Sequence, residues 1–81
     1  MNEISQIKEY ARKNSIPIVM DKGGEFICQT IVDRGCKRIL EIGSAIGYSA
    51  SRMSMVCGSE VVTIERDPKM YEEASKNIKR L

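Results

Sequence analysis

The stretch Arg38-Ile39-Leu40-Glu41-Ile42-Gly43-Ser44-Ala45-Ile46-Gly47-Tyr48-Ser49 decides how the rest of this chain is interpreted. Its first part is a short apolar run with β-branched residues, typical of a buried strand, and it stops at Gly43. A helical pattern begins at Gly47. Because glycine has no Cβ, a strand–glycine–helix turn lets the backbone approach a ligand closely.

A second apolar run, residues 61–64, predicts a second strand that ends at Glu65. This acid follows Gly43 by about 20 residues, where a carboxylate is placed to accept hydrogen bonds from a ribose diol. We therefore expect a nucleoside-containing cofactor across the ends of two parallel strands.

The composition is that of one small globular domain. The chain has 81 residues, 42% of them hydrophobic, and a net charge of +2, too small to argue for nucleic acid. The absence of histidine excludes His-based triads and zinc sites that need imidazole. The three cysteines form no C-x-x-C pair and suggest reduced, mostly buried thiols of a cytoplasmic protein. No signal peptide or membrane-spanning run is expected.

Periodicity and turn residues predict the order α-α-β-α-β-α. The expected elements are a helix ending near Asn14, an extended connector over 16–20, a turn over 21–25, a helix over 25–33 stopped by Gly35, the first strand, a helix from Gly47 to Gly58, a strand over 60–64 and a helix starting at Asp67-Pro68. The side chains expected to face inward are Ile4, Ile7, Ala11, Phe26, Ile27, Thr30, Ile31, Ala50, Met53, Cys57, Tyr71, Ala74, Ile78 and Leu81.

Both predicted strands are apolar at nearly every position, as in a parallel sheet covered by helices on both faces. Two strands leave open sheet edges, so we expect self-association into a homo-oligomer. The chain looks like the front half of a larger α/β domain. Residues 1–35 supply two helices, and residues 36–81 form a β-α-β-α unit.

The spacing of Gly43 and Gly47 matches neither the dinucleotide G-x-G-x-x-G nor a P-loop. With Glu41 before it, the turn is better matched to a ligand with a positive end than to a phosphate. The alternative is that the two glycines only end a strand and permit close helix packing.

The residues 40–50, LEIGSAIGYSA, resemble motif I of class I S-adenosylmethionine-dependent methyltransferases. Together with VVTIERDP at 61–68 and IPIVMDKGGEFI at 16–27, they are similar to the catechol and caffeoyl-CoA O-methyltransferase-like family, over about residues 4–81. The resemblance implies the N-terminal part of a Rossmann-like methyltransferase fold, as one truncated S-adenosylmethionine-binding domain over residues 1–81.

The resemblance also implies roles for individual residues. Glu41 would help to hold the cofactor's amino group, Ser49 its carboxylate, and Glu65 both ribose hydroxyls. The full set of cofactor-binding residues implied in this way is Val19, Met20, Glu41, Gly43, Ser44, Ala45, Gly47, Tyr48, Ser49, Glu65 and Arg66. Alternatives remain: Ser49 as a helix cap, Val19 and Met20 as core, and Glu65 as an ordinary exposed acid.

In this family Mg²⁺ assists the reaction, and its ligands are expected beyond the equivalent of Leu81, together with the acceptor site. We expect methyl transfer to a hydroxyl of a small molecule or a modified tRNA nucleoside, and no transfer by residues 1–81 alone. No catalytic or metal-binding residue is expected within them. A non-catalytic nucleotide-binding or oligomerisation fragment is the alternative. An NAD-dependent enzyme is disfavoured by the missing G-x-G-x-x-G.

Overall fold

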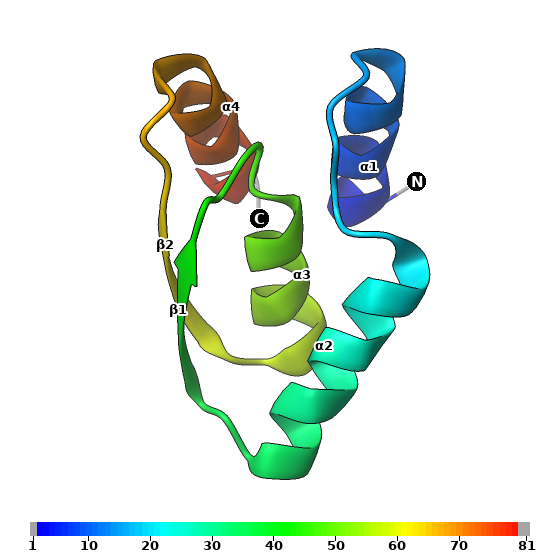
Figure 1. Ribbon diagram of the computed structural model, residues 1–81, viewed down its shortest axis with the longest axis vertical. Helices are drawn as coiled ribbons and strands as arrows, with labels where there is room; N and C mark the ends of the chain where they lie inside the picture. The colour runs from blue at the N-terminus through cyan, green and yellow to red at the C-terminus, as the bar shows by residue number, and fades with distance from the viewer. Residues whose placement is uncertain (1, 80–81) are drawn as a thin grey trace.

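The structure is a computed structural model that describes residues 2–79, as four helices and two strands in the predicted order (Figure 1). The elements are α1 (Glu3–Lys13), α2 (Asp21–Arg34), β1 (Arg38–Ile42), α3 (Tyr48–Cys57), β2 (Glu60–Ile64) and α4 (Pro68–Lys79). None of the helices within residues 2–79 has the length and apolar character needed to cross a membrane.

Two helix starts are determined by local hydrogen bonds. The Asn2 side chain accepts a hydrogen bond from Ser5 N at 2.8 Å and caps α1. Asp67 Oδ1 accepts hydrogen bonds from Lys69 N at 2.9 Å and Met70 N at 3.0 Å, just ahead of Pro68. These bonds satisfy N–H groups that have no partner inside the helix, so the start predicted at Asp67-Pro68 is confirmed.

The turn expected over residues 21–25 is wrong, because α2 already begins at Asp21. Gly24 N donates to Met20 O at 2.8 Å, and the helix continues through both glycines. Gly24 packs against α3: a Cβ at this position would displace the guanidinium of Arg52. The stop at Gly35 is confirmed, with a left-handed φ of 63°.

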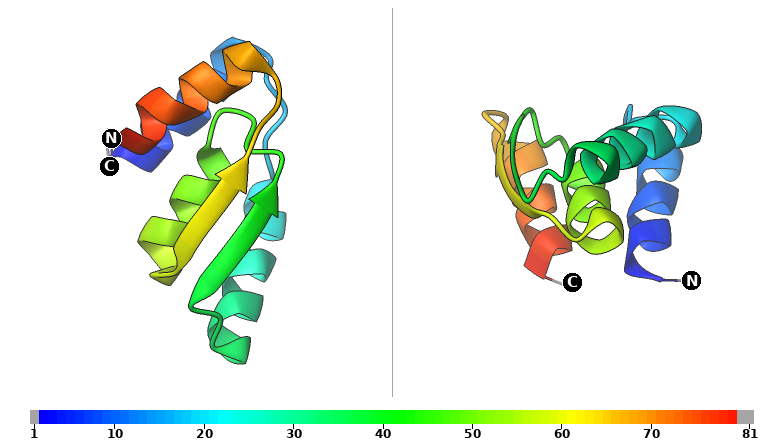
Figure 2. Two further views of the ribbon diagram at one scale, coloured as in Figure 1. Left: turned by 90° about the vertical axis from the view of Figure 1, so that its left-hand side faces the viewer. Right: turned by 90° about the horizontal axis from the view of Figure 1, so that it is seen from below.

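The strands β1 and β2 pair in parallel, as the sequence predicts, and Figure 2 (left) shows them side by side. In their register Arg38 lies opposite Glu60, and Glu41 lies opposite Thr63. Side chains alternate between two faces, so Glu41 and Thr63 share one face.

Helices cover only one face of this sheet. Figure 1 shows α2, α3 and α4 on the same side of the strands, and the left view of Figure 2 looks onto the uncovered side. The expectation of helices on both faces is therefore wrong for residues 2–79. The exposed apolar residues on the uncovered face are Leu40, Ile42, Val62 and Ile64, each more than half exposed.

The core lies between α1 and the start of α3, near the carboxyl ends of the strands. Ile7, Ala11, Ile46 and Tyr48 form it, and Ile16, Ile18 and Val19 of the connector pack against it. Ile31, Ala50, Met53 and Ala74 are buried as expected.

Several residues predicted to be buried are not. Phe26, Ile27, Tyr71 and Ile78 are exposed, and Tyr71 and Ile78 lie on α4, where the buried residues are instead Ala74 and Asn77. The inward face of α4 carries Ala74, which packs so closely on Gly47 that a Cβ there would lie 3.3 Å from Ala74 Cα. Leu81, expected on the same stripe, lies outside the described residues.

All three cysteines are free thiols. The prediction that they are mostly buried is wrong for Cys36, which is exposed, while Cys28 and Cys57 are half-buried. Burial, together with a hydrogen bond to Cys28, raises the pKa of the Cys57 thiol to about 11. Cys57 is therefore protonated near neutral pH and is a poor nucleophile.

Candidate functional site

The segment from Gly43 to Gly47 folds back over the end of β2. Gly43 N and Ser44 N both donate to Ile64 O, at 2.7 and 3.1 Å, and Gly47 N donates to Ser44 O at 2.8 Å. The turn needs left-handed backbone at Gly43 (φ 93°) and Gly47 (φ 85°), and Ala45 adopts it as well (φ 48°). A Cβ at Gly43 would meet nothing within 4 Å, so the surface of the turn is open at this residue.

Helix α4 supports the turn from behind. A Cβ at Gly47 would lie 3.3 Å from Ala74 Cα, so the glycine permits close packing as well as the backbone conformation. Asn77, which is 3% exposed, donates from Nδ2 to Ile46 O at 2.8 Å. Asn77 was not among the predicted site residues, because an asparagine among helical polar residues carries no signal of burial.

The carboxylate of Glu65 joins the end of β2 to this turn. Its Oε1 accepts from Ala45 N at 2.7 Å, and its Oε2 accepts from Asp67 N at 3.0 Å. The hydrogen bond from Asp67 N, and then that from Ala45 N, lowers the pKa of Glu65. Glu65 thus lies beside the glycine turn at the carboxyl edge of a parallel sheet, as the sequence predicts.

Glu41 lies in a network of hydroxyl groups on the covered face of the sheet. Thr63 Oγ1 donates to Glu41 Oε1 at 2.7 Å, and Ser49 Oγ donates to Glu41 Oε2 at 2.5 Å. Ser44 Oγ lies 2.5 Å from Thr63 Oγ1. The network links β1, β2, the turn and α3.

Neither Glu41 nor Glu65 forms a salt bridge within residues 2–79. The ion pairs of this part of the chain are Lys8–Asp21, Arg12–Glu9, Arg38–Glu60 and Lys76–Glu72, all at other places. Two half-buried carboxylates without a cationic partner give this edge of the sheet a negative potential. The edge therefore favours a ligand that carries positive charge or hydroxyl donors.

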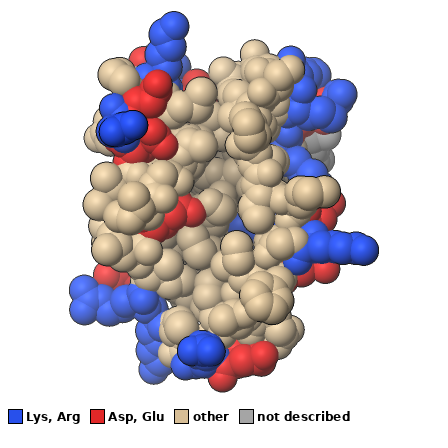
Figure 3. All heavy atoms as spheres, in the orientation of Figure 1, with Lys and Arg blue, Asp and Glu red and all other residues tan. Residues whose placement is uncertain are grey.

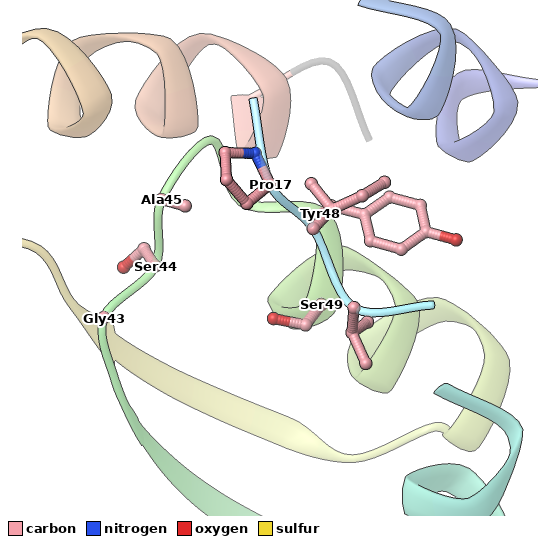
Figure 4. Close-up of a pocket in the computed structure, with 8 residues that line it drawn as sticks. Pro17, Gly43, Ser44, Ala45, Tyr48 and Ser49 are labelled. Carbon is pink, nitrogen blue, oxygen red and sulfur yellow. The ribbon is translucent and has the colours of Figure 1, made fainter. Parts of the chain in front are cut away.

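A pocket of about 220 Å³ opens between the turn, the connector and the start of α3 (Figure 4). In Figure 4 the Ser49 hydroxyl points toward the side of Gly43–Ala45, whereas the Tyr48 ring points away from it. The lining residues are Pro17, Ile18, Val19, Gly43, Ser44, Ala45, Tyr48 and Ser49. The pocket is smaller than the ~300–1,000 Å³ of complete small-molecule sites, so it suits one end of a ligand.

The structure brings together most of the residues singled out from the sequence. Val19 lines the pocket and also packs against the core. Glu41, Gly47 and Glu65 do not line it but are joined by hydrogen bonds to residues of the turn or of α3. Met20 is 81% exposed, Arg66 is exposed, and neither lines the pocket. Ser49 is no helix cap, since α3 has no side-chain cap and Ser49 contacts Glu41. Pro17 and Ile18 line the pocket and were missed, although the X-Pro extended segment was recognised.

Basic side chains do not gather near this site on the face shown in Figure 3. The view shows Lys and Arg mostly around the rim, and mostly uncharged atoms at the hollowed centre with acidic atoms beside it. Lys22, Arg34, Lys37 and Arg38 are all exposed. Spread and exposed in this way, they form a solvated surface and not a basic patch at the site.

A sequence model of the protein-L-isoaspartate(D-aspartate) O-methyltransferase family matches residues 2–81. This chain belongs to that family. A relative from Fervidobacterium nodosum, named protein-L-isoaspartate O-methyltransferase, is 39% identical over 57 residues, which are 68% of this chain and 29% of the relative.

Solved structures place the same fold among O-methyltransferases. A Staphylococcus aureus protein assigned to the caffeoyl-CoA O-methyltransferases is 36% identical with a TM-score of 0.90, over 99% of this chain and 39% of that one. An O-methyltransferase from Bacillus cereus in complex with SAH (S-adenosylhomocysteine) is 27% identical with a TM-score of 0.77, over 96% of this chain and 37% of that one.

The resemblance to S-adenosylmethionine-dependent O-methyltransferases is thus confirmed. The fold is the N-terminal part of a Rossmann-like methyltransferase fold. The chain spans about two fifths or less of the length of the proteins just described.

Proposed function

We propose that this chain is the cofactor-binding part of an S-adenosylmethionine-dependent methyltransferase that modifies an oxygen atom. The observation that carries the proposal is the convergence of Glu41, Glu65 and the glycine turn at the carboxyl end of two parallel strands. Ligands of open α/β sheets bind at this edge.

Glu65 is proposed to accept hydrogen bonds from both ribose hydroxyls of the cofactor. A carboxylate offers about four lone-pair positions, and two are used here by the N–H groups of Ala45 and Asp67. The remaining positions are free for a diol, and the backbone bonds hold the group in one orientation. The adenine would follow near Arg66, which is exposed to solvent.

Glu41 is proposed to face the positively charged methionine end of the cofactor, beside the pocket lined by Val19, Ser44 and Ser49. Ammonium and sulfonium groups are attracted to an unpaired carboxylate in a partly desolvated place. Ser49 gives its only hydroxyl proton to Glu41. Binding of the cofactor carboxylate by Ser49 therefore requires this hydroxyl to rotate when the ligand enters.

In the whole protein the methyl group would pass to an acceptor oxygen by in-line displacement, which requires donor and acceptor to be aligned in contact. The resemblance implies Mg²⁺ beside the acceptor. Within residues 2–79 no three His, Cys, Asp or Glu side chains are grouped to bind a metal ion.

The acceptor favoured by the caffeoyl-CoA-like resemblance is a hydroxyl of a small molecule or of a modified tRNA nucleoside. The family match and the Fervidobacterium relative support a second candidate, the carboxylate of an isoaspartyl residue in a protein. The two candidates share the cofactor site and differ in the product, which is an ether in the first case and an ester in the second.

Calorimetric titration of the whole protein with S-adenosylmethionine and S-adenosylhomocysteine tests the cofactor site. Glu65→Gln should weaken binding about ten- to a hundredfold, because hydrogen bonds to a charged group are lost. Glu60→Gln is the matched control, since Glu60 lies at the opposite end of β2 in an exposed ion pair, and it should bind like the wild type. No binding at millimolar cofactor would contradict the proposal and favour a non-catalytic fragment.

Methyl transfer from radiolabelled cofactor separates the two acceptors. A methyl ester on an isoaspartyl peptide is released by mild alkali, whereas a methyl ether on a phenol or nucleoside is retained. Label that survives alkali supports the hydroxyl acceptor, and label lost as methanol supports the carboxylate. Transfer to neither class would contradict both candidates.

The open edges and the uncovered face of the sheet support a further part of the proposal, association into a homo-oligomer. Leu40, Ile42, Val62 and Ile64 expose a continuous apolar surface beside unpaired strand edges. Sedimentation of residues 1–81 at increasing concentration should show association. A monomer throughout would contradict this part of the proposal and leave the cofactor site unaffected.

A further inference from the structure

The carboxylate of Glu41 is held by two hydroxyl groups that come from different elements. Thr63 on β2 bonds one oxygen and Ser49 on α3 bonds the other. Thr63 reaches Glu41 because the two residues are register partners in the parallel ladder and share the half-buried face. A one-residue shift of register would turn Thr63 to the other face.

The direction of the hydrogen bonds in this network follows from counting protons. A threonine hydroxyl has one proton, and Thr63 gives it to Glu41 Oε1. In the short contact between Ser44 and Thr63, Ser44 must therefore be the donor. The chain Ser44 to Thr63 to Glu41 runs from the glycine turn to the carboxylate, and every proton in it points toward Glu41.

Burial and a backbone hydrogen bond hold Ser44 at the start of this chain. Ser44 is 4% exposed, and its backbone N–H donates to Ile64 O, the residue next to Thr63. The turn is therefore hydrogen-bonded to the end of β2, and Thr63 links Ser44 of the turn to Glu41. Glu41 keeps lone pairs that no residue within 2–79 uses for an ion pair.

We infer that Thr63, oriented by Ser44, is a positioning residue that holds the Glu41 carboxylate where it receives the ammonium group of the cofactor's methionine end. The inference rests on the proposed function. It predicts a selective effect: losing the Thr63 hydroxyl should matter for ligands that carry the ammonium group and not for ligands that lack it.

The test measures the affinity of the whole protein for two ligands. S-Adenosylhomocysteine has the amino acid end, and 5′-methylthioadenosine is the nucleoside thioether without it. Thr63→Val keeps the branched shape that suits a strand and removes only the hydroxyl. It should weaken the affinity for S-adenosylhomocysteine about three- to tenfold and leave that for methylthioadenosine unchanged. This is less than the value of a hydrogen bond made directly to a charged ligand, because Thr63 acts through Glu41 and Ser49 still holds the other carboxylate oxygen.

Two further variants serve as controls. Thr63→Ser restores a hydroxyl and should recover the wild-type affinity. Thr30→Val removes the only other threonine hydroxyl of the chain, which donates to Phe26 O inside α2, and should change neither affinity. Equal weakening of both ligands by Thr63→Val, or no weakening of S-adenosylhomocysteine, would overturn the inference.

A measurement without ligand separates this inference from the proposed function. Carbon-13 NMR relaxation and scalar couplings of the Glu41 side chain should report one rotamer in the wild type and in Thr63→Ser, and averaging in Thr63→Val. An unchanged Glu41 rotamer in Thr63→Val would overturn the inference. If the wild type bound neither ligand, the proposed function would fail, and the NMR comparison would still decide whether Thr63 positions Glu41.

Discussion

The two ends of the β1–β2 sheet are built from similar residues and differ in what those residues contact. At the amino end, Ser59 Oγ donates to Cys36 O at 2.9 Å and Glu60 pairs with Arg38 at 3.5 Å. At the carboxyl end, the serine and glutamate side chains form a network around carboxylates that have no cation. At the amino end the carboxylate is paired with a cation, whereas at the carboxyl end the negative charges of Glu41 and Glu65 have no cationic partner within residues 2–79.

This difference indicates that the carboxyl end of the sheet is the end able to bind a positively charged ligand. A carboxylate already paired with arginine gains less from a positive ligand, because its charge is partly neutralised. Glu65, in contrast, is held by backbone N–H groups, which carry only partial charges. The difference predicts that matched substitutions at the two ends have different effects.

The largest effect on stability is expected from Gly47→Ala at the carboxyl end. The new methyl group would lie 3.3 Å from Ala74 Cα, and the alanine would have to keep the left-handed backbone conformation of Gly47. The two effects together should cost about 2–4 kcal/mol. Gly58→Ala at the amino end is the control. Its Cβ meets nothing within 4 Å, so only the backbone strain of about 1–2 kcal/mol remains.

Urea unfolding of both variants makes this comparison. Equal losses of stability would show that α4 does not press on the turn as tightly as Asn77 and Ala74 indicate.

Asn77→Ala should cost the protein about 1–3 kcal/mol, because it leaves the buried carbonyl of Ile46 without its donor. Asn14→Ala removes the same kind of bond, from Nδ2 to Tyr10 O at 2.9 Å, at an exposed site. This control should lose less than about 1 kcal/mol, since water replaces the donor. Thermal unfolding of the two variants measures the contrast, and an equal loss would be evidence against support of the turn by α4.

Ser59→Ala should cost about 1 kcal/mol and leave cofactor affinity unchanged, because its hydrogen bond lies at the amino end. Ser51 is equally buried, and its hydroxyl has no hydrogen-bond partner among residues 2–79. Ser51→Ala should therefore be neutral or stabilising. The denaturant midpoints of the two variants test this contrast in stability. A loss of stability in Ser51→Ala would contradict the prediction.

The smallest effect concerns pH. Hydrogen bonds from Asp67 N and Ala45 N lower the pKa of Glu65 below its ordinary value of 4.5, so they stabilise the fold when the carboxylate is charged. This contribution is present above pH 4.5 and is lost as the pH falls through the lower folded pKa. The melting temperature of the wild type should exceed that of Glu65→Gln near neutral pH, and the difference should shrink below pH 4.5. A constant difference would contradict these bonds.

Much of the fold was predictable because it depends on neighbours in the chain. Asp67-Pro68 marks the start of α4, because Asp67 caps its first N–H groups. Gly35 and Gly58 end their helices in a left-handed conformation, and both effects act within a few residues. The early start of α2 was missed because Gly23-Gly24 suggests a turn, whereas the guanidinium of Arg52 needs the space above Gly24. Tyr71 and Ile78 were predicted to be buried because apolar periodicity identifies one face of a helix but not which neighbour that face packs against, and both are exposed.

Part of the candidate site was also predictable from signals that lie close together in the chain. Gly43, Gly47 and Glu65 carry signals that can be recognised in the sequence, and they meet where expected. Met20 and Arg66 also belong to recognisable segments, yet both side chains are exposed, and neither lines the pocket. Pro17, Ile18, Thr63 and Asn77 carried no such signal.

The amino-acid sequence by itself determined the order of helices and strands, the turn at Gly43–Gly47 and the family, since each depends on residues close together in the chain. The tertiary structure alone decided that Thr63 meets Glu41, that Asn77 anchors Ile46, and that one face of the sheet stays uncovered. These contacts join segments about 20 or more residues apart, where strand register and helix packing, and not local preference, select the partner.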